Sequence, residues 1–194
     1  MLYARGARTG EAMEAFLHPS AAQLYDPFLF RDMDKAVALI QEAVQRGRRI
    51  CVYGDYDVDG VCATAIMLGA LEQLGAQAYY HVPSRHREGY GMNKAAVEEL
   101  AQTGTQLILT VDNGIKALEE IRLARELGMD VIVTDHHLCG DVLPEAAAIL
   151  CHTLPGSPYP NPDLCGAGTA YKLACALLGT EQAAGFLPLS TNTA

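Results

Sequence analysis

The sequence contains no stretch of about 18 or more uncharged apolar residues, the length that a membrane-spanning helix needs. Its N-terminus also lacks a positively charged segment followed by an apolar one, the pattern of a secretory leader. We therefore expect a cytoplasmic chain with no membrane partner. The 194 residues, of which 50% are hydrophobic, are enough to bury one complete core.

Cysteine pairs in metal-binding spacing are lacking as well, because none of the six cysteines forms a CxxC string. Most of them lie in apolar contexts, so we expect reduced thiols in the core and neither disulfides nor a zinc site. Basic residues are few: 14 Lys and Arg stand against 23 Asp and Glu, which gives a formal net charge of −9. This balance argues against a broadly basic nucleic-acid-binding surface, although bound metal would neutralise several of the acids.

Apolar runs and amphipathic segments alternate along the chain with a fairly even spacing. The expected strands cover residues 49–53, 77–82, 106–111, 130–134 and 147–150, and the expected helices cover 34–45, 61–74, 93–101, 117–127, 168–178 and 181–187. Such alternation predicts right-handed crossovers between parallel strands. The fold class that follows is α/β, with a mostly parallel, doubly wound sheet and helices on both of its faces. Residues 1–30 are expected to be a lead-in, and residues 31–194 one catalytic domain.

Three acidic strings each follow directly after an apolar run that predicts a buried parallel strand. They are GDYDVDG at 54–60, TVDNG at 110–114 and TDHH at 134–137. In an open α/β sheet, ligands gather outside the carboxyl ends of the strands. We therefore expect the side chains of Asp57, Asp59, Asp112 and His136 to meet at one edge. Carboxylates so close together require a counter-charge, which one or two metal ions supply.

The first string places Asp55, Asp57 and Asp59 at alternating positions in a loop after a strand, where two carboxylates can face neighbouring ions. Gly54 and Gly60 permit tight turns at both ends. A solvated acidic turn or a calcium loop are the alternatives. An EF-hand requires Glu at the twelfth loop position, and counting from Asp55 that position is Ile66, so the calcium interpretation fails.

The other two strings are weaker when taken separately. Asp-Asn-Gly at 112–114 is by itself typical of a simple turn, and two adjacent histidines can simply lie at the surface. Their position at the same edge of the predicted sheet as the first string favours a functional role. His136 is expected to bind metal while His137 faces the substrate, and Asp135 can hold an imidazole in one tautomer. Carboxylates with one imidazole suit Mn²⁺ or Mg²⁺, whereas structural zinc favours cysteines.

Taken together, these strings resemble the DHH phosphoesterase superfamily and, within it, the RecJ-type single-stranded-DNA exonucleases. The resemblance runs from about residue 26 to the C-terminus. Asp-His-His alone would indicate only the superfamily. The RecJ branch is indicated by GDYDVDG at 54–60, VPSR at 82–85, GYG at 89–91 and LCGAGTAYKL at 164–173.

The resemblance implies a role for each matching residue. Asp57, together with Asp55, would bind a first Mn²⁺ or Mg²⁺ ion, Asp59 and His136 a second, and Asp112 would bridge the two. The implied catalytic set is therefore Asp57, Asp59, Asp112, His136 and His137.

Substrate contacts follow from the same resemblance. His137 would contact the scissile phosphate and Arg85 would hold a nucleotide phosphate. The turn at Gly166 and Gly168 would offer backbone N–H groups to another phosphate, or else is only a helix start. Single-stranded DNA is the implied partner. Because a chain with a net charge of −9 repels a polyanion, we expect its contacts to be local to Arg85, Arg87 and Lys172.

The sequence also departs from the family pattern. The family has a further ligand aspartate beyond the helix at 168–178, and residues 186–194 contain none. The C-terminal DHH-associated domain of the family is absent from the 194 residues. We therefore expect an incomplete catalytic half of a 5′-to-3′ exonuclease. It is a fragment, a split gene product whose C-terminal half acts in trans, or a degenerate copy, and the sequence leaves these three open. The alternatives are a hydrolase of small phosphoesters, such as oligoribonucleotides or cyclic dinucleotides, and a catalytically inactive interaction module.

Overall fold

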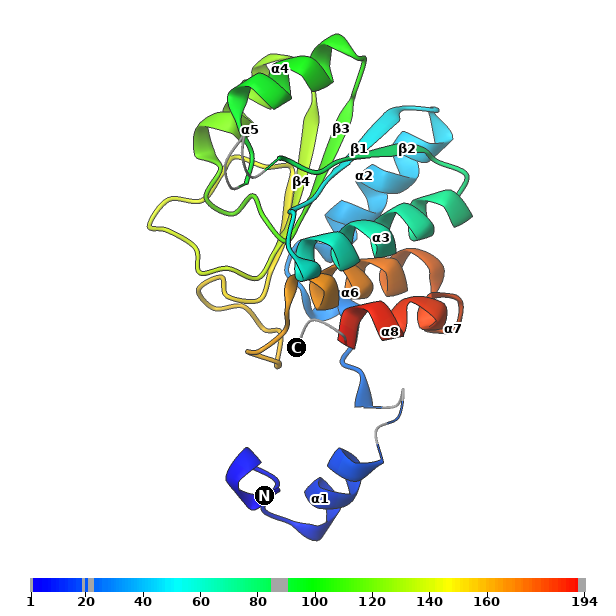
Figure 1. Cartoon of the computed structure of the whole chain (residues 1–194), viewed down its shortest axis with the longest axis vertical. Helices are drawn as coiled ribbons and strands as arrows, with labels where there is room; N and C mark the ends of the chain where they lie inside the picture. The colour runs from blue at the N-terminus through cyan, green and yellow to red at the C-terminus, as the bar shows by residue number, and fades with distance from the viewer. Residues whose placement is uncertain (1, 19, 21–22, 85–90, 192–194) are drawn as a thin grey trace.

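The computed structural model describes residues 2–18, 20, 23–84 and 91–191. Its centre is a five-stranded sheet with the order β2-β1-β3-β4-β5, and every neighbouring pair is parallel. The strands are β1 (Arg49–Tyr53), β2 (Gln77–His81), β3 (Leu107–Val111), β4 (Asp130–Asp135) and β5 (Ala148–Cys151). The order reverses between β1 and β3, which defines a doubly wound sheet (Figure 1). The expected fold class is confirmed.

The long helices are divided between the two faces of the sheet. They are α2 (Met33–Gln45), α3 (Val58–Gln73), α4 (Lys94–Gln102), α5 (Leu118–Glu126) and α6 (Gly166–Leu178). Alternate residues of β1 join different cores: Ile50 and Val52 pack with α2, α3 and α6, whereas Cys51 and Tyr53 pack with α4 and α5. Period-two alternation in a strand buried on both faces produces this division. All six cysteines are free thiols in the structure.

Short elements complete the chain at both ends. They are η1 (Tyr3–Arg5), α1 (Gly10–Leu17), η3 (Pro27–Leu29), α7 (Thr180–Ala183), η4 (Ala184–Phe186) and α8 (Leu187–Thr191). Figure 1 shows η1 and α1 apart from the sheet and its helices. By contrast, Phe30 is buried and stacks on Tyr159 with ring centroids 4.3 Å apart, so packing against the domain begins before residue 31.

Two helices begin earlier than the sequence predicts. Helix α3 starts at Val58 and not at 61, because Asp57 is its N-cap and accepts a hydrogen bond from the Gly60 N–H at 2.9 Å. Asp59 therefore lies in the first helical turn and not in the preceding loop. Helix α6 starts at Gly166 and not at 168, with Cys165 as its N-cap.

The expected nucleic-acid contact at Lys172 is wrong. Its side chain lies on α6 and is 4% exposed, and Nζ donates a hydrogen bond to the Tyr25 carbonyl oxygen at 2.6 Å. Burial lowers the pKa of this ammonium group. Lys172 therefore joins the N-terminal segment to α6 and is inaccessible to a polyanion.

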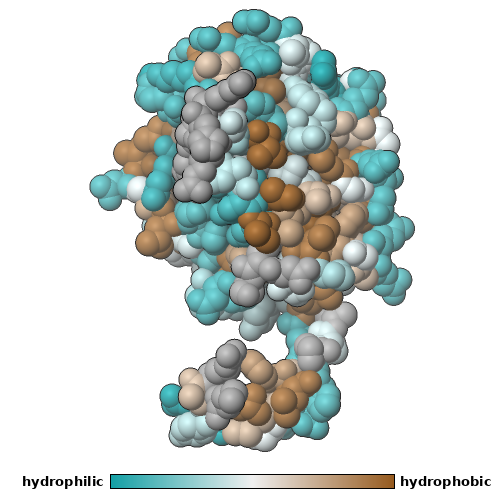
Figure 2. Space-filling model, viewed as in Figure 1, coloured by the Kyte–Doolittle hydropathy of each residue, from teal (hydrophilic) through white to brown (hydrophobic). Residues whose placement is uncertain are grey.

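Apolar side chains are also exposed beside the acidic loop. Figure 2 shows hydrophobic residues gathered near the middle of the visible face, with hydrophilic residues around them. Val58 and Val61 in the first turns of α3 are 64% and 51% exposed, and Val58 follows Asp57 directly.

No helix in the described ranges is long and apolar enough to span a membrane.

Candidate metal centre

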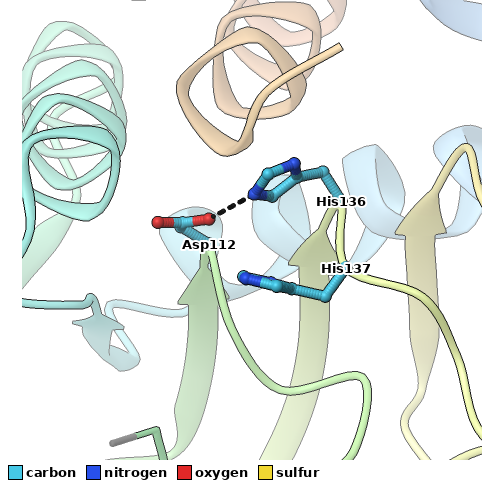
Figure 3. A group of neighbouring side chains, drawn as sticks. All are labelled: Asp112, His136 and His137. Atoms are coloured by element: carbon cyan, nitrogen blue, oxygen red, sulfur yellow. Dashed lines mark ion pairs between the residues drawn. The ribbon is translucent and has the colours of Figure 1, made fainter. Parts of the chain in front are cut away.

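The acidic and imidazole side chains converge where β1, β3 and β4 end. Figure 3 shows Asp112, after β3, facing His136 and His137, which follow β4. The His136 Nε2 atom lies 3.0 Å from Oδ1 of Asp112 and 3.5 Å from Oδ2 of Asp59. The parallel sheet brings these residues together because the carboxyl ends of its strands share one edge.

Asp112 adopts a backbone conformation that side chains rarely take. Its φ is 62°, and it is the one residue other than glycine with positive φ in the part of the chain that the structure describes. The turn around it is held by hydrogen bonds: the Asp112 N–H donates to Thr134 O at 3.0 Å, and the Thr110 hydroxyl donates to Asn113 O at 2.8 Å. Such a conformation persists only where the surroundings enforce it, and it is frequent at functional sites.

The Asp112 carboxylate is buried beside an imidazole. Its residue is 1% exposed, and its Oδ1, which makes no other polar contact among the described residues, forms an ion pair with Nε2 of His136 at 3.0 Å. The pKa of Asp112 is raised to about 6: burial is the largest cause, the neighbouring Asp59 and Asp57 add to it, and His136 opposes them. A buried anion is costly unless cations compensate it, and the raised pKa shows that His136 does so only in part, so this carboxylate fits a metal ligand.

Two overlapping groups of potential ligands share this carboxylate. In one group, atoms of Asp112, His136 and His137 lie within 4.8 Å of one another, and in the other, oxygens of Asp55, Asp57 and Asp112 do so. Asp55 is buried, and its Oδ1 accepts a hydrogen bond from the Tyr56 N–H at 2.7 Å. Carboxylate oxygens with an imidazole nitrogen match the donor set that Mn²⁺ accepts.

Asp59 joins two helices at the centre. Its carboxylate oxygens accept hydrogen bonds from the backbone N–H groups of Gly166 and Ala167, both at 2.7 Å, so it links the first turn of α3 to the first turn of α6. Gly166 also packs against Asp112: a Cβ atom at this position would lie 2.6 Å from Cγ of that side chain. Only glycine fits between the helix start and the carboxylate.

The expectation of free phosphate donors at the start of α6 is not met by the structure. The Gly166 N–H donates to Asp59, and the Gly168 N–H donates to Sγ of Cys165 at 3.3 Å. Both glycines are buried. Their structural role is to permit close packing, and their N–H groups are already engaged within the protein.

The second histidine belongs to a separate dyad. Nδ1 of His137 lies 2.7 Å from Oδ1 of Asp135, and Oδ2 of Asp135 accepts a hydrogen bond from the Ile115 N–H at 2.9 Å. The pKa of Asp135 is lowered: burial would raise it, but the hydrogen bonds from His137 and the Ile115 N–H outweigh burial. The hydrogen bond with Asp135 raises the pKa of His137, which favours its protonated form.

Several contributors could not be found from the sequence. Asn113 ties the ends of two strands together, because its Nδ2 donates to Val111 O at 2.9 Å and to Tyr53 O at 3.1 Å. The partners Asp59 and Gly166 are 107 positions apart, and no local pattern indicates such a contact. Arg85 and Arg87, the remaining expected phosphate contacts, lie outside the described residues.

The fold and the centre together define an α/β protein that gathers carboxylates and imidazoles at the carboxyl edge of a parallel sheet. The family model described as the DHH family, N-terminal domain, matches residues 49–192. The chain belongs to the DHH family, and the resemblance noted from its motifs is confirmed.

Relatives and solved structures agree with this assignment. The chain is 46% identical to the single-stranded-DNA-specific exonuclease RecJ of Bacillus subtilis over 92% of its own length and 23% of the relative. It is 40% identical to RecJ of Escherichia coli over 91% of its own length and 30% of the relative. The chain thus spans about a quarter to a third of the curated relatives that it matches.

Two crystal structures of RecJ share the fold. An exonuclease RecJ bound to manganese has a TM-score of 0.71 and 39% identity, with 79% of this chain and 38% of that chain covered. RecJ of Thermus thermophilus in complex with Mn²⁺ has a TM-score of 0.75 and 32% identity, with 97% of this chain and 26% of that chain covered.

The ionisation of the centre predicts opposite pH dependences with and without metal. The pKa of Asp112 is raised to about 6, and those of His136 and His137 are raised from 6.5, so the folded chain binds protons more readily than the unfolded chain. Their contribution to stability is therefore present at low pH and is lost as pH rises through these folded values. In EDTA, the melting temperature should be higher at about pH 5.5 than at about pH 8.

Excess Mn²⁺ should reverse this slope, because metal binding requires deprotonated ligands. Thermal unfolding followed by circular dichroism at several pH values measures both slopes. An Asp112→Asn, His136→Gln double variant is the control: it should lose the response to Mn²⁺ and keep only the part of the EDTA slope that His137 supplies. Slopes of the same sign with and without Mn²⁺ would contradict the metal assignment.

Proposed function

We propose that this chain is a Mn²⁺- or Mg²⁺-dependent phosphoesterase domain that hydrolyses single-stranded DNA from the 5′ end, as the names of its RecJ relatives indicate single-stranded DNA for those proteins. The observation that carries the proposal is the buried Asp112 carboxylate, which belongs to both groups of potential ligands among the described residues. A carboxylate in that position suits a bridging ligand between two ions.

The ligand residues divide around Asp112. Asp57 and Asp55 would hold one ion, Asp59 and His136 the other, and Asp112 both. When bound, such ions supply activation of water and stabilisation of the charge that develops on a phosphodiester. The chain itself positions the ligands: the backbone N–H groups of α6 fix Asp59, and the strained turn fixes Asp112.

His137 would act on the substrate and not on the ions. Its hydrogen bond with Asp135 fixes the ring and raises its pKa, so its other ring nitrogen is able to donate a hydrogen bond to a phosphate oxygen. The ring centroids of His136 and His137 lie 4.5 Å apart, which places this donor beside the ligand set. Arg85 remains the proposed second phosphate contact.

The net charge of −9 limits where a polyanion can bind. Single-stranded DNA should bind where the ions reverse the local field, and binding should therefore require divalent metal and weaken with salt.

The expectation that a second half completes the centre remains part of the proposal. It is supported by the share of the relatives' length that this chain spans.

The proposal is tested with a single-stranded oligonucleotide labelled at its 5′ end, a dinucleotide, and Mn²⁺. We expect release of labelled mononucleotide from the oligonucleotide, no release in EDTA, and a loss of about 100-fold or more in an Asp57→Asn variant, because a metal ligand positions the reaction. Asp141→Asn, which changes an exposed carboxylate in a loop, is the matched control.

The same assay separates the alternatives. Hydrolysis confined to the dinucleotide would support a small-phosphoester hydrolase, and no hydrolysis of either substrate by the chain with the C-terminal half of a RecJ relative added would support an inactive module. If the chain is a nuclease, that addition should raise turnover at least about tenfold, because positioning dominates such reactions.

A further inference from the structure

A pocket of about 290 Å³ lies beside His137, on the side of β3 and β4 that carries α4 and α5. Its walls come from the start of α4 and from the segment between β3 and α5. The side chains that matter here are Met92, Asn113, Ile115, Lys116, Glu120 and His137. This volume is close to the roughly 300 Å³ at which pockets for small ligands begin, which suits one small planar group such as a nucleobase.

Asn113, one of the residues that line the pocket, carries a buried acceptor without a hydrogen-bond partner among the described residues. Asn113 is 2% exposed, and both hydrogens of its Nδ2 are engaged by Val111 O and Tyr53 O, which settles the orientation of the amide. Among the described residues, Oδ1 of Asn113 has no hydrogen-bond partner. A buried amide oxygen without a partner costs free energy, and a ligand N–H group would recover it.

The charges along the pocket orient a ligand within it. Asp135 is satisfied internally, since its oxygens accept hydrogen bonds from Ile115 and from the His136–His137 segment. Glu120 is half-buried and adds a second acceptor. Lys116 supplies a cation, and the ring of His137 lies at the end nearest the metal centre. A phosphate is therefore favoured at the His137 end, and N–H donors are favoured near Asn113 and Glu120.

Apolar side chains also line the pocket. Ile115 is 1% exposed and Met92 is 8% exposed, and both belong to its walls. A branched aliphatic side chain and a polarisable thioether both pack well against a flat aromatic ring. A ligand with a planar face, N–H donors on its edge and a phosphate at one end combines all of these features.

We propose that this pocket binds the base of the nucleotide whose phosphate lies at the metal centre. The inference rests on the proposed phosphoesterase function and adds a base-binding subsite to it. Guanine fits the acceptors best, because it presents two adjacent N–H donors on one edge. The phosphate of the same nucleotide reaches His137, and the sugar lies between them.

The test uses the whole chain with saturating Mn²⁺ and two probes that differ only in the base, dGMP and 2-deoxyribose 5-phosphate. Isothermal titration calorimetry should show dGMP binding at least about tenfold more tightly, because the base gains stacking and hydrogen bonds in the pocket. Ala117→Phe, which fills the pocket from its wall, should remove this difference without weakening the sugar phosphate. Glu120→Gln should reduce the difference, and Glu126→Gln, an exposed carboxylate on the same helix, should not change it.

Equal affinities for the two probes, or binding of neither, would overturn the base subsite. A preference for dGMP that survives Ala117→Phe would overturn it too, because the base would then lie elsewhere. The Mn²⁺ affinity of the same samples is measured first without nucleotide. Normal Mn²⁺ binding with no preference for dGMP rejects only this inference, whereas a loss of Mn²⁺ binding rejects the metal centre.

Discussion

Asp112→Asn should reduce Mn²⁺ affinity by more than about 100-fold. This loss is larger than the one usually seen when a residue that only hydrogen-bonds to a metal ligand is changed. The substitution preserves the shape of the side chain, and asparagine tolerates the left-handed conformation that Asp112 adopts with φ of 62°. It removes the one carboxylate that belongs to both groups of potential ligands among the described residues. Calorimetry with Mn²⁺ measures the loss directly.

The same variant should not lose stability without metal. The Asp112 carboxylate is buried, and its raised pKa shows that the cost of burying its charge outweighs its ion pair with His136, so removing the charge relieves a net cost. In EDTA, the melting temperature of Asp112→Asn should therefore equal or exceed that of the unchanged chain. Asp112→Ala should bind Mn²⁺ as poorly but be less stable, because alanine in the left-handed region costs about 1–2 kcal/mol.

Asp141→Asn serves as the matched control for these experiments, since it changes an exposed carboxylate of the same chain. Unchanged Mn²⁺ affinity in Asp112→Asn would place the metal ligands elsewhere. A large fall in the melting temperature in EDTA would instead show that the ion pair with His136 outweighs the cost of burying the carboxylate.

Gly166→Ala should weaken Mn²⁺ binding by about 10- to 100-fold, the range found when groups that support metal ligands are changed. The added methyl group would lie 2.6 Å from Cγ of Asp112, so either that carboxylate or the start of α6 must move. A shift of α6 also displaces the two N–H groups that hold Asp59. Overpacking of this kind costs about 1–3 kcal/mol of stability as well.

A control in the same helix separates the metal effect from the loss of stability. Gly168→Ala would place a methyl group 2.6 Å from Cδ1 of Leu164, a side chain outside the proposed ligand set. It should lower the melting temperature while leaving Mn²⁺ affinity within about twofold, because no ligand or supporting N–H group is displaced. If both variants lose stability and metal affinity in the same proportion, Gly166 has no specific role in positioning the ligands.

The strands could be predicted closely because they are short, apolar and buried on both faces. The sequence predicts β3 at 106–111 and the structure has it at Leu107–Val111, and the difference is a single residue at one end. The start of α3 could not be placed as well. The string after β1 contains three aspartates, any of which can cap a helix, and the choice of Asp57 depends on its hydrogen bond to Gly60 in the folded chain.

The role of Lys172 shows how burial overrides charge. A lysine beside a glycine-rich helix start suggests a phosphate contact, but the position lies on the inner side of α6, where Nζ meets the Tyr25 carbonyl group. The partner is 147 positions away in the chain, and only the packing of the N-terminal segment against α6 brings it there. A contact between residues so far apart in the sequence leaves no local sequence pattern from which it could be predicted.

The sequence by itself determined the family, the parallel sheet and the edge at which the acidic strings end, because strand periodicity and motif spacing are local properties. The tertiary structure alone decided which groups meet at that edge. It paired Asp59 with the start of α6, gave Gly166 its place against Asp112, and left an oxygen of Asn113 buried without a hydrogen-bond partner among the described residues. These features depend on the approach of segments far apart in the chain, and local spacing does not encode such distances.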